Sequence, residues 1–147
     1  MGLLGFSPTI PTHKQSLLLV QRLDESPALN ETPCLWIENE EQLWFNPCHI
    51  RCPRAQLRAV RDVMQTISVP SVCVHFDFRS LCAQDMWRLL SITTDEERQI
   101  GTSLWLTLPC RVHRVNVFVS NAFTRFFVRR IIATCLSEKM KSRVFLL

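Results

Sequence analysis

Glycine is scarce in this 147-residue sequence, which contains only Gly2, Gly5 and Gly101. Loops that wrap a phosphate closely need glycine, because it adopts backbone angles that other residues avoid and lets the chain approach the ligand. No Walker loop and no dinucleotide-binding fingerprint can be assembled from these three positions. The sequence therefore argues against a nucleotide-binding enzyme.

Long hydrophobic runs are also absent, and none approaches the roughly 20 residues that span a bilayer. The first residues, MGLLGFSP, are apolar over too short a stretch for a signal peptide, and no basic residue precedes them. The myristoylation pattern fails because position 6 is Phe6 and the serine arrives at Ser7. Seven cysteines, an odd number, fit reduced thiols. We therefore expect a cytoplasmic protein, in peripheral contact with intracellular membranes.

The chain lacks the second half of a usual zinc motif. Cys48, His49 and Cys52 could begin a zinc site with Cys34 as the fourth ligand, but a paired second half is missing. We expect no metal and no cofactor, and keep zinc as an alternative. Tyrosine is absent as well. Because the aromatic residues of the last helix read as facing inward, stacking platforms are hard to place and we expect no nucleic-acid partner.

No catalytic arrangement can be built from the polar residues. Asp77 ends a strand-like run, as an aspartyl nucleophile would, but that chemistry needs a second acid where the sequence has Arg79. We interpret Asp77 as a structural residue that caps the next turn. None of the four histidines lies in a nucleophile-elbow context, and His75 reads as a core histidine. We expect a protein that is not an enzyme.

Positive charge is concentrated at the end of the chain. Residues 111–147 hold eight of the 17 Lys and Arg residues and only one of the 13 Asp and Glu residues. This segment therefore presents a positive surface, for which anionic lipid, nucleic acid or an acidic protein is a plausible partner. A solvated helix face without a partner is the alternative interpretation.

Hydrophobic periodicity predicts alternating strands and helices. After an irregular lead-in over residues 1–15, we expect a strand at 16–23, helix at 54–67, strand at 72–78, mainly helix at 84–108 with a break near Gly101, strand at 112–119, helix at 122–141 and strand from 144. Residues 34–53 are ambiguous. This alternation predicts an α/β fold, a three-layer α/β/α lobe with a mainly parallel sheet, over residues 16–147.

The last helix is both apolar and basic. Its apolar residues cover more of the circumference than the single stripe that packing on a sheet requires. The excess could line a ligand cavity or contact a membrane, with basic side chains meeting lipid phosphates. An ordinary buried helix is the alternative. The apolar residues are Phe123, Phe126, Phe127, Ile131, Ile132, Cys135, Leu136 and Met140.

Three segments in order, VCVHFDFRSL, LPCRVHRVNVFV and FFVRRIIATCLSEKMKSRVFLL, resemble the CRAL-TRIO lipid-binding domain. The resemblance covers residues 70–147 and is faint over 16–69. It implies binding and transfer of a lipid or another hydrophobic small molecule, of the retinoid, tocopherol or phospholipid class, without a chemical step. It also implies contact with membranes that contain phosphoinositides.

The resemblance assigns two sets of residues. The matching phosphoinositide-binding positions are Arg111, His113, Lys139 and Arg143. The matching lining positions of a hydrophobic ligand pocket are Val72, Phe76, Ile100, Leu108, Cys110 and Val115. The helical domain before the family's lobe and the segments after its fourth strand have no counterpart in this sequence. The alternative is therefore a truncated or vestigial lobe that acts as a protein-interaction module or binds no ligand.

Overall fold

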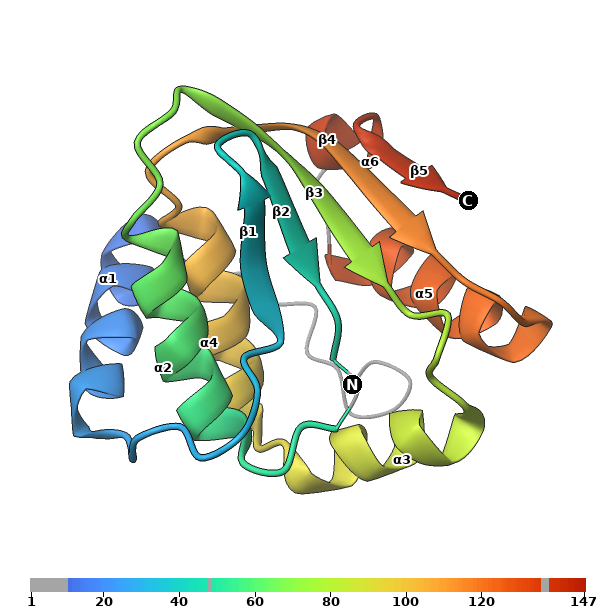
Figure 1. The fold of residues 1–147 in the computed structure, drawn as a ribbon, viewed down its shortest axis with the longest axis horizontal. Helices are drawn as coiled ribbons and strands as arrows, with labels where there is room; N and C mark the ends of the chain where they lie inside the picture. The colour runs from blue at the N-terminus through green and yellow to red at the C-terminus, as the bar shows by residue number, and fades with distance from the viewer. Residues whose placement is uncertain (1–10, 48, 136–137) are drawn as a thin grey trace.

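The computed structural model describes residues 11–47, 49–135 and 138–147 (Figure 1). The chain forms a five-stranded sheet with helices between the strands. The helices are α1 (His13–Gln21), the short 3-10 helix η2 (Arg22–Glu25), α2 (Pro53–Met64), α3 (Ala83–Ile92), α4 (Asp95–Leu106), α5 (Ala122–Cys135) and α6 (Glu138–Lys141). The strands are β1 (Leu35–Asn39), β2 (Gln42–Phe45), β3 (Ser71–Asp77), β4 (Arg111–Phe118) and β5 (Val144–Leu146).

The strands lie side by side in the order of the sequence, from β1 at one edge to β5 at the other. β1 and β2 form an antiparallel hairpin, and every later pair is parallel. The predicted α/β fold with a mainly parallel sheet is confirmed. Helices connect the parallel strands, as parallel pairing requires.

One face of the sheet carries the core. Val74 of β3 and Val115 of β4 cluster with Val128 of α5, and Trp105 of α4 packs against the same cluster. A neighbouring cluster joins Leu35 of β1 to α2 and α4, through Val60, Met64, Ile100 and Leu104. The helices α2, α4 and α5 therefore bury the apolar residues of one face, which alternate along each strand with residues of the other.

The other face carries a row of planar side chains. The strand register places Trp36, Trp44, His75, Asn116 and Phe145 in line across all five strands. The Trp44 and His75 rings stack at 4.4 Å between centroids. Trp36 and Phe145, at the two ends of the row, are each 43% exposed.

The prediction of a strand at residues 16–23 is wrong, because this segment contains most of α1. Helix α1 begins with a capping box in which the Thr12 hydroxyl accepts a hydrogen bond from the Gln15 N–H and the Gln15 side chain accepts from the Thr12 N–H. Leu19 and Val20 pack against the core, whereas Leu17 and Leu18 remain exposed. The irregular lead-in predicted over residues 1–15 overlaps α1 from His13 onward. Residues 1–10 of that lead-in lie outside the described residues.

The predicted helix break near Gly101 is also wrong. Gly101 lies inside α4, and the break between α3 and α4 falls at Thr93 and Thr94. Thr94 caps α4: its hydroxyl accepts from the Glu97 N–H at 3.1 Å, and the Glu97 carboxylate accepts from the Thr94 N–H at 2.8 Å. This reciprocal box starts a new helix where the sequence has no glycine.

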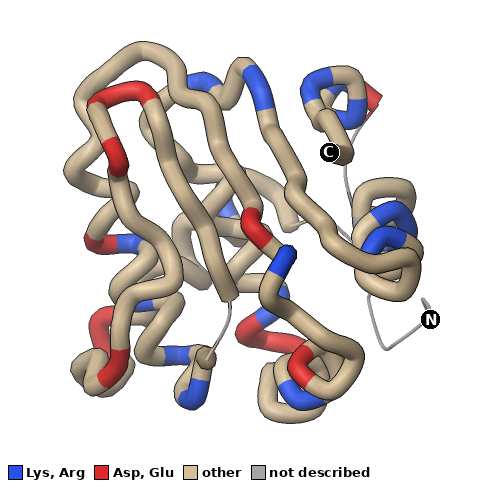
Figure 2. The backbone as a smooth tube through the Cα atoms, turned by 45° about the vertical axis from the view of Figure 1, so that its right-hand side comes forward, with Lys and Arg blue, Asp and Glu red and all other residues tan. Residues whose placement is uncertain are grey.

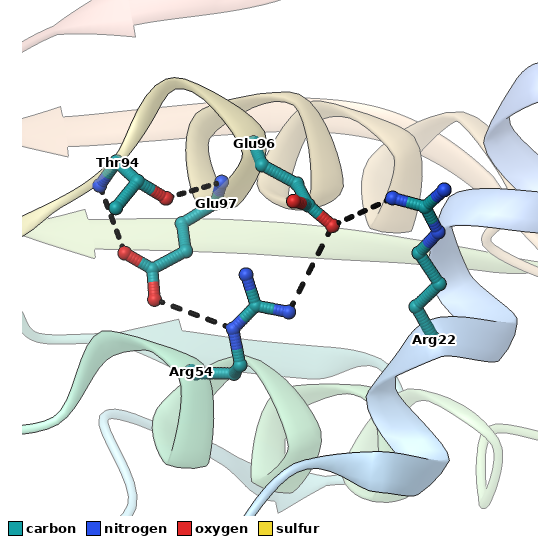
Figure 3. Close-up of polar contacts among 5 residues, drawn as sticks. All are labelled: Arg22, Arg54, Thr94, Glu96 and Glu97. Carbon is teal, nitrogen blue, oxygen red and sulfur yellow. Dashed lines mark hydrogen bonds and ion pairs between the residues drawn. The ribbon is translucent and has the colours of Figure 1, made fainter.

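Ion pairs connect the start of α4 to two other helices (Figure 3). Arg54 of α2 lies 3.7 Å from the buried Glu97 carboxylate and 3.9 Å from the Glu96 carboxylate. Arg22, directly after α1, approaches Glu96 to 2.9 Å. The network links α2 and the end of α1 to the start of α4 beside the core.

The remaining predicted elements agree closely with the structure. The helix expected at 54–67 is α2, the strands expected at 72–78 and 112–119 are β3 and β4, and the apolar run from 144 is β5. The ambiguous residues 34–53 contain the β1–β2 hairpin. Within the helix expected at 122–141 the structure describes α5 and α6, and residues 136–137 lie outside the described residues.

Candidate functional site

A groove of about 340 Å³ lies between α5 and β5. Ile132 and Ala133 of α5 form one wall, and Val144 and Leu146 of β5 form the other. The groove is small among ligand pockets, which span roughly 300–1,000 Å³. Its walls are aliphatic, so its chemistry suits part of an acyl chain or another apolar group.

The strand pairing of β5 positions the second wall of the groove, formed by Val144 and Leu146. β5 pairs with β4 so that Val144 lies beside Val115 and Leu146 beside Val117. Because side chains alternate along a strand, Val144 and Leu146 share the helix-covered face with those core valines. Phe145 points to the opposite face, where the Arg114 guanidinium lies 4.1 Å from the centre of its ring.

Two cations line the groove beside its aliphatic walls, Arg129 of α5 and Lys141 of α6. Lys141 forms an ion pair with the largely exposed Glu138 at 2.9 Å. Arg129 is exposed on the helix surface. The groove therefore combines an apolar lining with a positive one, as an anionic amphiphile requires.

The four predicted phosphoinositide-binding residues come from two segments that meet at one end of the sheet. Arg111 and His113 are exposed near the start of β4, and Lys139 is exposed on α6. Arg143 connects the two segments, because its guanidinium donates a hydrogen bond to the Val112 carbonyl at 3.1 Å. We call Arg111, His113, Lys139 and Arg143 the basic end; in Figure 2, basic residues mark both the start of β4 and α6.

A register shift shapes the start of β4. Val72 pairs with Val112 and Cys73 pairs with Arg114, so His113 is an extra residue opposite the β3 strand. A bulge of this kind redirects side chains. Here it allows Val112 to pack against the core cluster while Arg114 lies on the opposite face beside Phe145.

The six predicted pocket residues are not gathered around the groove. Val72 and Val115 belong to the core cluster between the sheet and α5, and Phe76, Leu108 and Cys110 pack against it. Ile100 belongs to the neighbouring cluster. Phe76 contacts the Trp105 ring at 5.5 Å between centroids. In the part of the chain that the structure describes, these six residues pack in the interior. Their assignment to a ligand pocket stays a prediction.

The sequence predicted the last helix and the strand from 144, but not that this strand forms a wall of the groove. Arg129, Ile132 and Lys141 lie in the apolar and basic segment that drew attention, whereas Val144 and Leu146 carry no signal beyond hydrophobicity. The side chains of Ile131, Cys135 and Leu136, which the same segment includes, lie outside the described residues. Strand pairing supplies the missing wall.

Asp77 has the structural role expected from the sequence. Its carboxylate accepts hydrogen bonds from the Arg79 N–H at 3.1 Å and from the Arg79 guanidinium at 3.0 and 3.1 Å. These bonds hold the pKa of Asp77 below its usual value, against the opposing effect of burial. The carboxylate is thereby occupied by the turn that follows β3.

The zinc alternative depends in part on Cys48, which lies outside the described residues. Burial raises the pKa of the Cys34 thiol to about 12, which disfavours the thiolate that zinc binds. Among the residues that the structure describes, no group of three His, Cys, Asp or Glu side chains is arranged to hold a metal ion.

The described helices include none with the length and hydrophobicity needed to cross a bilayer. No protein-family model matches the chain, and a search of curated proteins finds no match to it.

Proposed function

We propose that the protein binds an anionic lipid without catalysing a reaction, with an apolar part of the lipid in the groove between α5 and β5. The observation that carries the proposal is the groove itself, where aliphatic walls meet Arg129 and Lys141. The phosphate-bearing head group is of the phosphoinositide class and contacts the basic end. The resemblance of residues 70–147 to a lipid-binding lobe points to the same class of ligand.

Exposed aromatic residues favour a membrane as the source of the lipid. Phe126 of α5 is 54% exposed and Trp87 of α3 is 53% exposed, and both rings contact Phe127. The expectation that the aromatic residues of the last helix face inward is therefore wrong for Phe126 and for Phe123, which is 41% exposed. Helix α5 carries three arginines and no acidic residue. Aromatic rings together with arginines suit the interface of an anionic bilayer. The proposal thus places the protein at the cytoplasmic surface of intracellular membranes.

The basic end is tested by sedimentation with vesicles of phosphatidylcholine, with and without phosphatidylinositol phosphates. The variant Arg111→Ala/Lys139→Ala removes two exposed charges and spares Arg143, which is bonded to β4. Each basic residue near an anionic surface contributes about 1 kcal/mol, so we expect partitioning to fall about 30-fold.

The matched control is Lys14→Ala/Arg51→Ala, which removes the same charge from exposed positions outside the basic end. We expect its partitioning to stay close to that of the unchanged protein. Equal losses in both variants would show that net charge alone governs binding and would contradict a specific basic end.

The groove is tested separately by filling it. Ala133 is exposed and lines the groove, so Ala133→Trp should occupy the space without disturbing the core. Native mass spectrometry after incubation with lysophosphatidylinositol should show less retained lipid than the unchanged protein. Undiminished retention by a folded Ala133→Trp variant would exclude the groove as the binding site.

A further inference from the structure

The hairpin strand β1 forms the edge of the sheet opposite β5, and among the described residues it pairs only with β2. An edge strand presents a row of backbone N–H and C=O groups that a further strand can pair with. The side chains of Trp36 and Ile37 are 43% and 37% exposed. This edge is therefore both open and hydrophobic, which is unusual for a strand in contact with water.

A second groove, of about 540 Å³, runs along this edge between β1 and α2. Pro33 and Ile37 line it from the hairpin side, and Val63 and Thr66 from the helix side. Leu35, Trp36 and Ile37 of β1 all line the groove, so it follows the edge of the strand rather than one face of the sheet. A strand added at this edge would place apolar side chains against the groove.

The surroundings of this edge are acidic. Glu38, Glu40 and Glu41 are exposed at the end of β1 and in the turn that follows, which Figure 2 shows as an acidic end of the hairpin. Asp62 lines the groove itself. Arg61 forms ion pairs with both Asp24 and Asp62, so the acidic charge at this edge comes mainly from the hairpin residues Glu38, Glu40 and Glu41.

We propose that the β1 edge binds an extended basic segment of a partner protein as an additional strand. Apolar side chains of that segment enter the groove, and the Lys or Arg residues that alternate with them face Glu38 and the acidic turn. Charge complementarity favours this partner over pairing of β1 with β1 of a second copy, since that copy would offer the same acidic edge. This surface lies at the opposite edge of the sheet from the proposed lipid groove.

The test uses synthetic peptides of about six residues, the usual length of a strand. One peptide alternates valine with lysine, and the other alternates valine with glutamate. Nuclear magnetic resonance should show slowed amide exchange within β1 and shifted signals of Val63 and Thr66 on addition of the lysine peptide. We expect the glutamate peptide to bind at least about tenfold more weakly, because several like charges face the acidic edge.

The variant Ile37→Lys places a charge at the groove and should reduce affinity for the lysine peptide at least about tenfold. Leu106→Lys is the matched control, because Leu106 is exposed on α4 and does not line the groove. Equal affinity of the two peptides, or unchanged amide exchange in β1, would overturn the proposal. A β1-dependent dimer in sedimentation equilibrium would assign the edge to a second copy instead. Vesicle binding should be unaffected by Ile37→Lys, which separates this proposal from lipid binding.

Discussion

At the scale of single residues, His75 lies on the sheet face opposite the two core clusters, not in the core as expected, and it shows how that face is held together. Its ring stacks on Trp44, one ring nitrogen bonds the Gln42 side chain, and the other lies 3.3 Å from the Asn116 amide nitrogen. Burial lowers the pKa of His75; Arg114 adds to this effect, and Glu38 opposes it. The folded protein therefore favours the neutral imidazole.

This shift predicts a pH-dependent stability. Because the folded pKa lies below the unfolded value of about 6.5, the contribution of His75 is complete above that value and is lost as the pH falls through the folded pKa. Urea-unfolding midpoints of the unchanged protein and His75→Gln should converge between about pH 7.5 and pH 5. Parallel pH profiles of the two proteins would show that His75 does not carry the effect.

At the scale of elements, the starts of α1 and α4 depend on short polar motifs rather than on hydrophobic pattern. Thr94 and Glu97 start α4, and Thr12 and Gln15 start α1 in the same way. Glu97 is also nearly buried beside Arg54, so its carboxylate both caps α4 and faces α2. The cap therefore links α4 to α2 as well as setting one helix boundary.

Removal of the cap should destabilise the protein measurably. Thr94→Ala leaves the Glu97 N–H without its hydroxyl partner, and a lost N-cap costs about 1 kcal/mol. Thr94→Ser keeps the hydroxyl and is the matched control. Chemical denaturation monitored by circular dichroism should show the loss for alanine and only a small change for serine. Equal destabilisation by both would indicate that the threonine methyl group, rather than the cap, is responsible.

At the scale of the whole molecule, the two edges of the sheet differ in charge. The hairpin at β1 ends in acidic residues, whereas the start of β4, α5 and α6 carry a group of basic residues (Figure 2). If the protein binds lipid as proposed, this separation would orient it in the field of an anionic membrane, with the basic side inward and the acidic hairpin outward. The proposed lipid groove and the proposed peptide-binding edge can then be occupied at the same time.

The aromatic residues should add a salt-independent part to membrane binding. Phe126→Ser removes an exposed ring from α5, and Leu106→Ser is the control at a similarly exposed position on α4. Partial burial of a phenylalanine in a bilayer contributes on the order of 1 kcal/mol, so vesicle binding should fall several-fold for Phe126→Ser alone. The loss should persist at about 1 M salt, where charges are screened beyond about 3 Å. A loss that vanishes at high salt would contradict insertion of the ring.

Elements defined by local sequence pattern could be predicted, whereas elements defined by contacts between distant residues could not. Strands β3 and β4 are short segments in which valine recurs, and helix α2 has a clear apolar face, so local pattern sufficed for them. The run Leu17–Val20 reads equally well as a strand, and its helical form was decided by the Thr12 cap and packing on α4. The helix break at Thr94 was not predicted, because the break was assigned to Gly101 and the capping box of Thr94 and Glu97 was not considered.

Local sequence pattern was enough to predict the α/β class, the strands at 72–78 and 112–119 and the concentration of positive charge in the last 37 residues. Hydrophobic periodicity and charge are properties of local segments, so they can be read without the fold. Three features could be seen only once the chain was folded. β5 forms the groove wall that faces α5, and Arg143 bonds to the start of β4. Val72, Phe76 and Ile100 pack within the core. Those features depend on strand register and on side chains distant in sequence. A local pattern contains no information about such contacts, since they form only when the chain folds.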